Sequence, residues 1–502
     1  MDHTTKGKQS KISQAIGLVG MLLVILAVGS CKKNRPPNID HGFPEDVAEL
    51  LRENCATSGC HEPTSFEGAG GLNLNTWDDL FTGARGGSPV VPYNPEASYL
   101  LQALNTDTNW LPQLLPTMPL GGEAYTPLEL QVIIDWINDG APNANGEEPF
   151  PPQADRTKWY VANRRCDEIG VFDAASGQVM RVIPIGNDGG AIEEPMNVVL
   201  SPDQQRLYVS FLYWNPHIEV YNTLTDEPVM DIELDRHGYS HLAISPDGNF
   251  LFAVSQWQKL LSVVNLNTGL RADGPISLPE NSAGLAVHPN RSTIYYGSTE
   301  SEHINLWDYN SNGELSNYRT VDLVQHIPAP ANLPYPIEPV DIEFLSDGSK
   351  YFVSCYATHE IRVFDGNNDS LLNVIPTAGF PDQIAISEVS QQLYISCELE
   401  TDMHGGDPLK KGAVSILDYA SNTHIKDLYT GFQPHGIDVD ESSGYVVVAH
   451  RNLDPGAPPS HHGSKCEGRN GNIVLIDKNT LEVVPDYKPE LSVDPFALVV
   501  KD

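Results

Sequence analysis

The sequence predicts a multidomain protein, with a small all-α domain followed by an all-β propeller of seven blades that the C-terminal strand closes. Apolar residues recur at helical spacing only in the first part of the chain. From residue 157 onward, short alternating strands repeat with a period of roughly 45 residues, the range expected for propeller blades. A length of 502 residues is also too great for one ordinary core.

Residues 1–30 have the pattern of a secretory signal. Three lysines near the start precede an apolar run, 16–28, that is too short to span a membrane comfortably. The run ends in Val-Gly-Ser-Cys, which resembles a bacterial lipoprotein processing site and implies lipidation of Cys31. An ordinary cleaved signal or a membrane anchor is the alternative. Residues 31–44, which contain three prolines, read as a tether. We therefore expect an exported lipoprotein on a bacterial membrane, on the periplasmic or surface face of the outer membrane.

The next segment, 45–142, contains the most informative motif of the chain, Cys-Ala-Thr-Ser-Gly-Cys-His at Cys55–His61. Two thiols followed at once by an imidazole are the layout of a covalent haem site, although the usual spacing has two residues between the cysteines and this one has four. A small disulfide loop leaves the adjacent histidine unexplained. A zinc site needs two further ligands, and the next cysteine is far along the chain.

The end of this segment predicts a methionine loop and a closing helix. Met118 is the one methionine of the seven that falls after the haem motif and before the repeats, and prolines flank it. Thr126-Pro127-Leu128-Glu129 is a capping box with proline at the first helical position. Apolar residues then recur at helical spacing until Gly140 ends the helix.

Taken together, this segment resembles the small bacterial c-type cytochromes, whose closing helix ends as Trp136-Ile137 and Gly140-Ala141 do here. The resemblance implies one covalent haem c. Cys55 and Cys60 would form the thioether bonds, and His61 and Met118 would be the proximal and distal iron ligands. His41 is a less favoured axial alternative, and a loop methionine packed on the core is the alternative for Met118.

Residues 157–502, after a linker at 143–156, repeat a strand, a turn of the Ser-Pro-Asp-Gly type and a second strand. A seventh unit is split, with its first strand at 495–500 and its second at 158–163, so that pairing them closes the ring without a free edge. The repeats resemble the YVTN-type propeller family, which includes lactonase-like and surface-layer proteins. The six full units are 197–210, 241–255, 284–298, 341–354, 383–396 and 436–449.

Equivalent blade positions place several polar residues on one face of the predicted ring. They include His241, Asp341, Asp382, His435 and His450, and long insertions at 400–411 (with His404) and 452–469 (with His461, His462 and Cys466) lie nearby. Three interpretations stay open: hydrated loop ends, a small-ligand site, or a metal or second cofactor, for which His241, His435 and His450 are the candidate ligands. A disulfide between Cys355 and Cys397 is a further alternative.

A net charge of −36 disfavours nucleic acid and anionic lipid as partners. It suits a basic redox partner, and it serves solubility equally well.

The function that we expect is extracytoplasmic one-electron transfer by the haem, with the propeller as a docking or ligand-binding module. That is more the profile of an electron carrier or binding protein than of an enzyme. The alternatives are a redox enzyme that passes electrons between the haem and a propeller-bound substrate or metal, and a non-enzymatic haem-bearing scaffold. A lactonase-like hydrolase is least favoured, because no catalytic set stands out.

Overall fold

The structure is a computed structural model that describes residues 41–186, 190–234, 236–328, 337–398 and 412–502. The predicted signal, the lipidation site Cys31 and most of the tether lie outside the described residues, as does His404 of one insertion. No helix among the described residues is long and apolar enough to cross a membrane.

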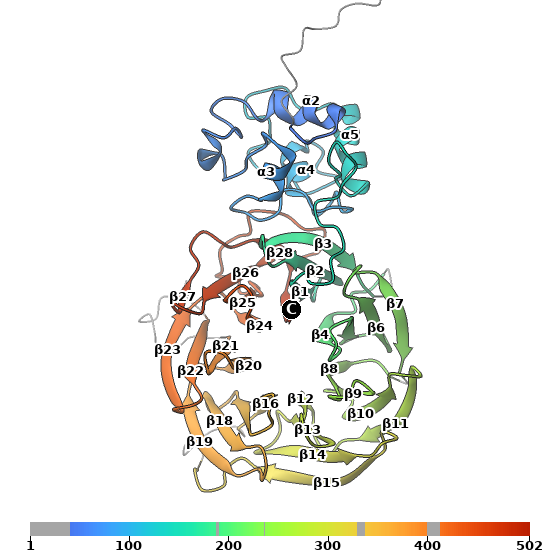
Figure 1. The fold of residues 1–502 in the computed structure, drawn as a ribbon, viewed down its shortest axis with the longest axis vertical. Coiled ribbons are helices and arrows are strands. Elements are labelled where there is room, and N and C mark those ends of the chain that lie inside the picture. Colours follow the sequence, from blue (N-terminus) through green and yellow to red (C-terminus); the bar gives the residue numbers. More distant parts are fainter. Residues whose placement is uncertain (1–40, 187–189, 235, 329–336, 399–411) are drawn as a thin grey trace, which may run out of the picture. The chain divides into compact units, whose positions relative to one another are not determined.

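The helical segment has four α-helices and one short 3-10 helix (Figure 1). They are α2 (Glu45–Asn54), η1 (Phe66–Gly68), α3 (Trp77–Phe81), α4 (Tyr99–Leu104) and α5 (Pro127–Asn138). Helix α5 begins as predicted, because the Thr126 side chain accepts from the Glu129 amide while the Glu129 carboxylate accepts from the Thr126 amide. It ends before Gly140, whose φ of +91° is the left-handed conformation that glycine adopts without strain.

These helices share one apolar core. Leu51, Leu80, Leu101, Ile133 and Ile137 are fully buried in it. Burial of this kind stabilises the fold by about 1.5–3 kcal/mol for each large aliphatic side chain. Helices this short depend on that packing, because they are only marginally stable in isolation.

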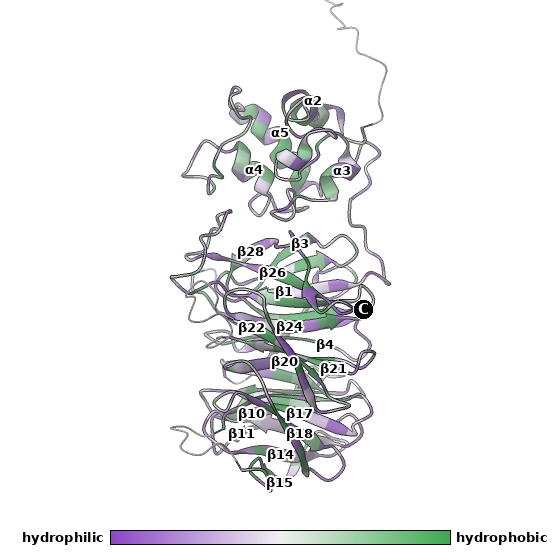
Figure 2. Ribbon diagram, turned by 90° about the vertical axis from the view of Figure 1, so that its left-hand side faces the viewer, coloured by the Kyte–Doolittle hydropathy of each residue, from purple (hydrophilic) through white to green (hydrophobic). Residues whose placement is uncertain are grey.

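The described residues from 158 onward form seven antiparallel sheets arranged as a ring, which confirms the predicted propeller (Figure 1). Figure 2 shows apolar residues concentrated along the strands, as expected for sheets that pack face to face. Blade 1 contains β1 (Lys158–Asn163), β2 (Glu168–Asp173), β3 (Gln178–Pro184) and β29 (Pro495–Lys501); blade 2, β4 (Pro195–Leu200), β5 (Arg206–Phe211), β6 (His217–Asn222) and β7 (Pro228–Glu233); blade 3, β8 (Tyr239–Ile244), β9 (Phe250–Ser255), β10 (Leu260–Asn265) and β11 (Leu270–Ser277); and blade 4, β12 (Ala283–Val287), β13 (Thr293–Gly297), β14 (His303–Tyr309) and β15 (Leu315–Asp322). Blade 5 contains β16 (Pro339–Phe344), β17 (Lys350–Cys355), β18 (Glu360–Asp365) and β19 (Leu371–Pro376); blade 6, β20 (Pro381–Ser387), β21 (Gln392–Cys397), β22 (Ala413–Asp418) and β23 (Thr423–Tyr429); and blade 7, β24 (Pro434–Asp440), β25 (Tyr445–His450), β26 (Asn470–Asp477), β27 (Glu482–Val483) and β28 (Glu490–Val493).

Blade 1 is assembled from both ends of the propeller sequence. Strand β29 pairs with β1 from Lys158↔Lys501 to Asn163↔Pro495, with one bulge. This pairing confirms the predicted closure. It gives β1 a hydrogen-bonded neighbour on each side and so removes an open edge from the ring.

Side chains also tie the innermost strand of one blade to that of the next. Asn197 accepts a hydrogen bond from the Leu242 amide (3.0 Å), and Asp341 accepts one from the Ile384 amide (2.8 Å). Asp438 does the same for Val500 of β29 (2.8 Å). Asp341, which the sequence suggested for the functional face, therefore has a structural role between blades 5 and 6.

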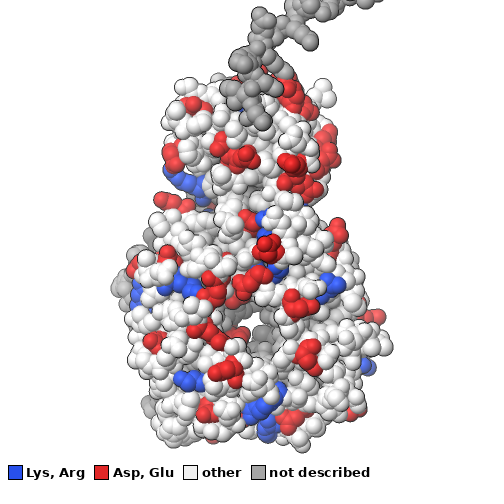
Figure 3. All heavy atoms as spheres, in the orientation of Figure 1, with Lys and Arg blue, Asp and Glu red and all other residues white. Residues whose placement is uncertain are grey.

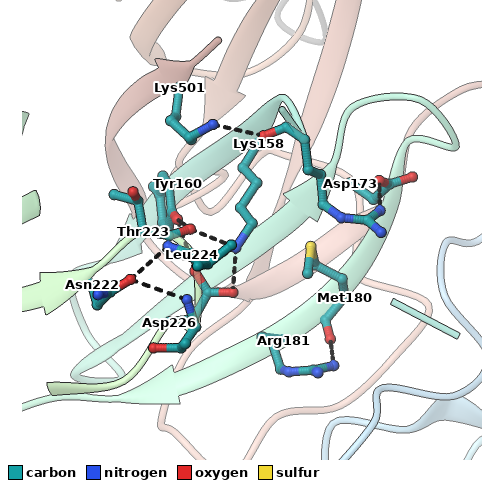
Figure 4. Close-up of polar contacts among 12 residues, drawn as sticks. Lys158, Tyr160, Asp173, Met180, Arg181, Asn222, Thr223, Leu224, Asp226 and Lys501 are labelled. Carbon is teal, nitrogen blue, oxygen red and sulfur yellow. Dashed lines mark hydrogen bonds and ion pairs between the residues drawn. The ribbon is translucent and has the colours of Figure 1, made fainter. Parts of the chain in front are cut away.

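A buried ion pair joins blade 1 to blade 2 (Figure 4). The Lys158 ammonium lies 2.7 Å from the Asp226 carboxylate and donates to the Thr223 carbonyl at 2.8 Å. The Tyr160 hydroxyl also donates to Asp226, at 2.8 Å. Both charged side chains are almost fully buried. Hydrogen bonds from two side chains thus offset the cost of removing the carboxylate from water.

The cysteines of the propeller do not pair as the sequence suggested. Cys355 and Cys397 are free and buried, so the inter-blade disulfide considered for them is wrong. The disulfide joins Cys166, after β1, to Cys466 in the 452–469 insertion. Its partners are 300 residues apart in sequence, a separation that no local pattern reveals.

Candidate functional site

Cys55, Cys60, His61 and Met118 all line one cavity of about 720 Å³ in the helical segment. The sequence motif and the methionine loop, more than fifty residues apart, are thus brought to the same space. Most of the remaining wall is apolar, from Leu72, Leu74, Leu100, Ala103, Leu104, Leu114, Pro89 and Pro119. An apolar pocket with a few fixed donor atoms is the kind of site that a cofactor occupies.

The four-residue spacer between the cysteines is folded back on itself. The Cys60 amide donates to the Thr57 carbonyl (3.0 Å), and the His61 amide donates to the Cys55 carbonyl (3.1 Å). Gly59 has a φ of +84°, which permits this turn without side-chain strain. The wider loop therefore brings the His61 backbone back to that of Cys55. The thiols of Cys55 and Cys60 are both free.

His61 is oriented by the backbone. Its Nδ1 lies 3.0 Å from the Leu72 carbonyl oxygen, which can only accept, so Nδ1 carries the hydrogen and Nε2 keeps its lone pair. Burial lowers the pKa of His61, with the Leu72 hydrogen bond opposing. The ring is therefore a neutral nitrogen donor at neutral pH. A histidine whose other nitrogen is held in this way is the usual arrangement for a metal ligand.

Tyr125 was not singled out from the sequence, and it fixes the first cysteine. Its hydroxyl donates to the Leu50 carbonyl (2.8 Å) and lies 3.5 Å from the Cys55 sulfur, which is buried. Because the hydroxyl has one hydrogen, its oxygen is left to accept from the thiol. Burial raises the pKa of Cys55.

The Met118 loop is attached to α4 by backbone hydrogen bonds. The Met118 amide donates to the Ala103 carbonyl (2.8 Å), and the Leu114 amide donates to the Gln102 carbonyl (3.0 Å). Met118 packs against the helical core, and its side chain lines the cavity. The loop is therefore positioned by an element other than the one that carries His61.

A second residue that sequence reasoning did not place here is His462 of the 452–469 insertion. It lines the same cavity and stacks on Tyr99 with ring centroids 3.5 Å apart. Its backbone amide donates to the Glu490 carboxylate (2.8 Å), and Gln102 exchanges hydrogen bonds with Gly463. The Cys166–Cys466 disulfide restrains the same insertion.

A separate cavity of about 680 Å³ occupies the propeller channel. His241, Asp341, Asp382 and His435 line it, as expected from the blade alignment. Figure 3 shows acidic side chains around the central opening of the ring. His450 is not among the lining residues, because its ring is buried, with Nε2 2.9 Å from the Thr430 hydroxyl.

The channel residues influence one another's ionisation. Burial raises the pKa of Asp341 to about 7 and the pKa of Glu343 well above its ordinary value, and neighbouring carboxylates contribute. Burial lowers the pKa of His241 to about 4. Burial alone would raise the pKa of Asp382, but His435, Arg451 and His241 outweigh it and lower the pKa.

Comparison with known families bears on the helical segment. Residues 58–112 match the family model described as Planctomycete cytochrome C. The match includes Cys60 and His61, and it begins after Cys55 and ends before Met118. The chain joins a cytochrome c domain to a seven-bladed propeller.

Similar curated proteins and solved structures match part of the chain. Antigen Lp49 of Leptospira interrogans is 23% identical over 307 residues, which are 59% of this chain and 63% of that protein. A 6-phosphogluconolactonase of Pectobacterium carotovorum is 24% identical over 175 residues, 33% of this chain and half of the relative. The chain thus spans less than two thirds of either relative. A functionally unknown protein from Desulfotomaculum acetoxidans has a TM-score of 0.50 at 15% identity, covering 68% of this chain and 98% of that one, and this likeness shows the fold alone.

The raised pKa of Asp341 leads to a prediction for stability against pH. The folded pKa is about 7 and the ordinary value is 3.8, so folding favours the protonated acid. The corresponding stabilisation is complete below about pH 4 and is lost as the pH rises through about 7. Asp341→Asn keeps an oxygen for the Ile384 amide and removes the titration. We expect the decline in the free energy of unfolding between pH 5 and 8 to be smaller in the variant by roughly 2–3 kcal/mol. Urea unfolding at the two pH values measures it, and equal declines in both proteins would contradict it.

Proposed function

We propose that the chain carries a single covalent haem c in the cytochrome c domain and transfers single electrons outside the cytoplasm. The observation that carries this proposal is the convergence of two free thiols, a neutral imidazole and a thioether on one apolar cavity. A haem held by these residues would supply one-electron transfer between Fe(II) and Fe(III). With His61 and Met118 both as iron ligands, no position on the iron would be left for a substrate.

Each residue has a distinct part in this proposal. Cys55 and Cys60 would attach the porphyrin, with the first sulfur held by Tyr125. His61 would present Nε2 to the iron with its ring fixed by Leu72. The Met118 thioether would raise the reduction potential, and the apolar wall would exclude water and favour the less charged state. The Met118 loop would be positioned by its attachment to α4 and not by the haem motif.

The proposed setting is a bacterial membrane, with the mature chain anchored through a lipid on Cys31. A chain with 66 acidic and 30 basic side chains favours a basic redox partner by long-range attraction. Acidic side chains are visible over both domains in Figure 3.

A second candidate function is a redox enzyme that passes electrons between the haem and a substrate or metal in the propeller. The observation that favours it is the channel cavity, where His241, Asp382 and His435 meet. Loop ends that were merely hydrated would not require this buried set of titratable groups.

The test of the haem proposal is its attachment. The full chain, made with haem-maturation machinery, is denatured, extracted with acidified solvent and examined as the pyridine haemochrome. We expect the colour to stay with the polypeptide, with about one haem per chain. Cys60→Ser should shift the haemochrome band, because one vinyl group of the porphyrin is then left unreacted.

Cys397→Ser is the matched control, because this buried thiol lies in the propeller beside the Ser415 hydroxyl. It should keep the wild-type haemochrome spectrum. A colourless wild-type protein, or haem that extracts freely from it, would overturn the proposal.

A further inference from the structure

We propose that the propeller channel binds one divalent transition-metal ion of the zinc type through His435, Asp382 and Glu398. This site is independent of the haem and lies in the other domain. One nitrogen and two oxygen ligand atoms of these residues all lie within 4.8 Å of one another. His435 and Asp382 also line the open channel, which gives an ion and its water ligands a route of entry.

His435 is oriented as a metal ligand. Its Nδ1 lies 2.8 Å from the Phe496 carbonyl oxygen, so that nitrogen carries the hydrogen, and the ring packs on Phe496 with centroids 3.7 Å apart. The other nitrogen, Nε2, then points its lone pair at the Asp382 carboxylate, 2.9 Å away. Two lone pairs that face each other need a cation between them. A proton or a metal ion meets that need, and the measurement below distinguishes them.

Glu398 is held in place by two donors. One oxygen accepts from Arg451 (3.0 Å) and the other from the Tyr356 hydroxyl (3.2 Å). Each carboxylate oxygen retains a second lone pair for a metal. Arg451 also forms an ion pair with Asp494 at 2.7 Å. Its positive charge is therefore divided between two carboxylates and neutralises Glu398 only in part.

His241 offers a fourth donor on the same cavity. Its Nδ1 lies 3.1 Å from the Ser240 hydroxyl, and its Nε2 makes no hydrogen bond to any described residue. His241 lies outside the 4.8 Å group and would complete the site by moving toward the ion.

The donor chemistry selects the class of ion. Imidazole nitrogen combined with carboxylate oxygen suits Zn²⁺ and its first-row neighbours, whereas Ca²⁺ and Mg²⁺ prefer oxygen alone. No thiolate belongs to the group, which argues against a copper(I) site.

The test uses the full-length holoprotein and Zn²⁺ alone as the probe. After equilibration with zinc and dialysis, elemental analysis should find about one zinc per chain besides the haem iron. Isothermal titration with zinc should show roughly tenfold or greater loss of affinity in His435→Gln and in the near-isosteric Asp382→Asn. The second variant keeps the test valid if the histidine variant folds poorly.

Glu388→Gln is the control, because it removes a carboxylate from the wall of the same channel cavity and Glu388 is not one of the ligands. It should retain stoichiometric zinc. Wild-type protein without bound zinc would overturn the proposal and leave His435 and Asp382 as a direct imidazole–carboxylate pair. Equal losses in Glu388→Gln and Asp382→Asn would overturn it in favour of diffuse attraction by the acidic channel. Haem is counted separately, so a chain with haem and no zinc sinks this proposal alone, and a chain with zinc and no haem sinks only the electron-transfer proposal.

Discussion

Replacing Met118 with alanine should lower the reduction potential of the loaded protein by on the order of 100 mV, within the roughly 0.8 V range that axial ligands control. The thioether is a weak donor that stabilises the reduced iron, and removing it leaves the distal position to water or to another side chain. The Met118 backbone is held by the Ala103 carbonyl, so the loop should keep its place when the side chain is shortened. Spectroelectrochemical titration measures the potential. The charge-transfer band at the red end of the oxidised spectrum, which reports methionine bound to iron, should disappear.

Met230→Ala is the matched control, because this methionine lies on β7 with 44% of its surface exposed and is far along the chain from the haem motif. It should leave both the potential and the band unchanged. A band that persists in Met118→Ala would remove Met118 from the coordination scheme and direct attention to His41 or to His462, which lines the cavity.

Replacing Asp226 with asparagine should lower the free energy of unfolding of the propeller by about 3–5 kcal/mol. The Lys158 ammonium would stay buried without its counter-charge, and burial already lowers the pKa of this lysine against the attraction of Asp226. Denaturant unfolding followed by fluorescence should show an earlier transition with an unchanged slope.

The double variant Lys158→Met with Asp226→Asn separates the two contributions. Removing both charges should recover a large part of the lost stability, because no uncompensated charge then remains buried. If the double variant is as unstable as the sum of two single losses, packing rather than charge holds this junction between blades 1 and 2.

The architecture could be predicted from the sequence because the same strand-and-turn pattern recurs in every blade. Each blade carries the same turn chemistry, and the split unit left one strand without a partner at each end of the propeller. Likewise, the capping box of α5 is a local pattern, and local patterns predict local structure well. Contacts between loops that lie outside the repeat pattern were not predictable in this way. Cys166–Cys466 joins two loops whose approach depends on the whole ring.

The candidate sites divide along the same line. Adjacency in sequence identified Cys55, Cys60 and His61, and scarcity identified Met118. No local sequence pattern pointed to Tyr125, His462 or Glu398. Each of them contacts residues that are distant in sequence and become neighbours only in the folded protein. Blade alignment placed His241 and His435 on the channel, yet it grouped His450 with them, since alignment gives the height of a residue on a blade and not the direction of its ring.

The pairing of β29 with β1 also imposes an order on maturation. During synthesis the helical segment emerges early, whereas blade 1 has to wait for β29, which is made after the other described strands. Until that strand is made, one edge of β1 has unpaired backbone N–H and C=O groups. Chaperones and aggregating chains can both pair with that edge. The helical segment can therefore complete its own core while the ring that follows it in sequence is still open.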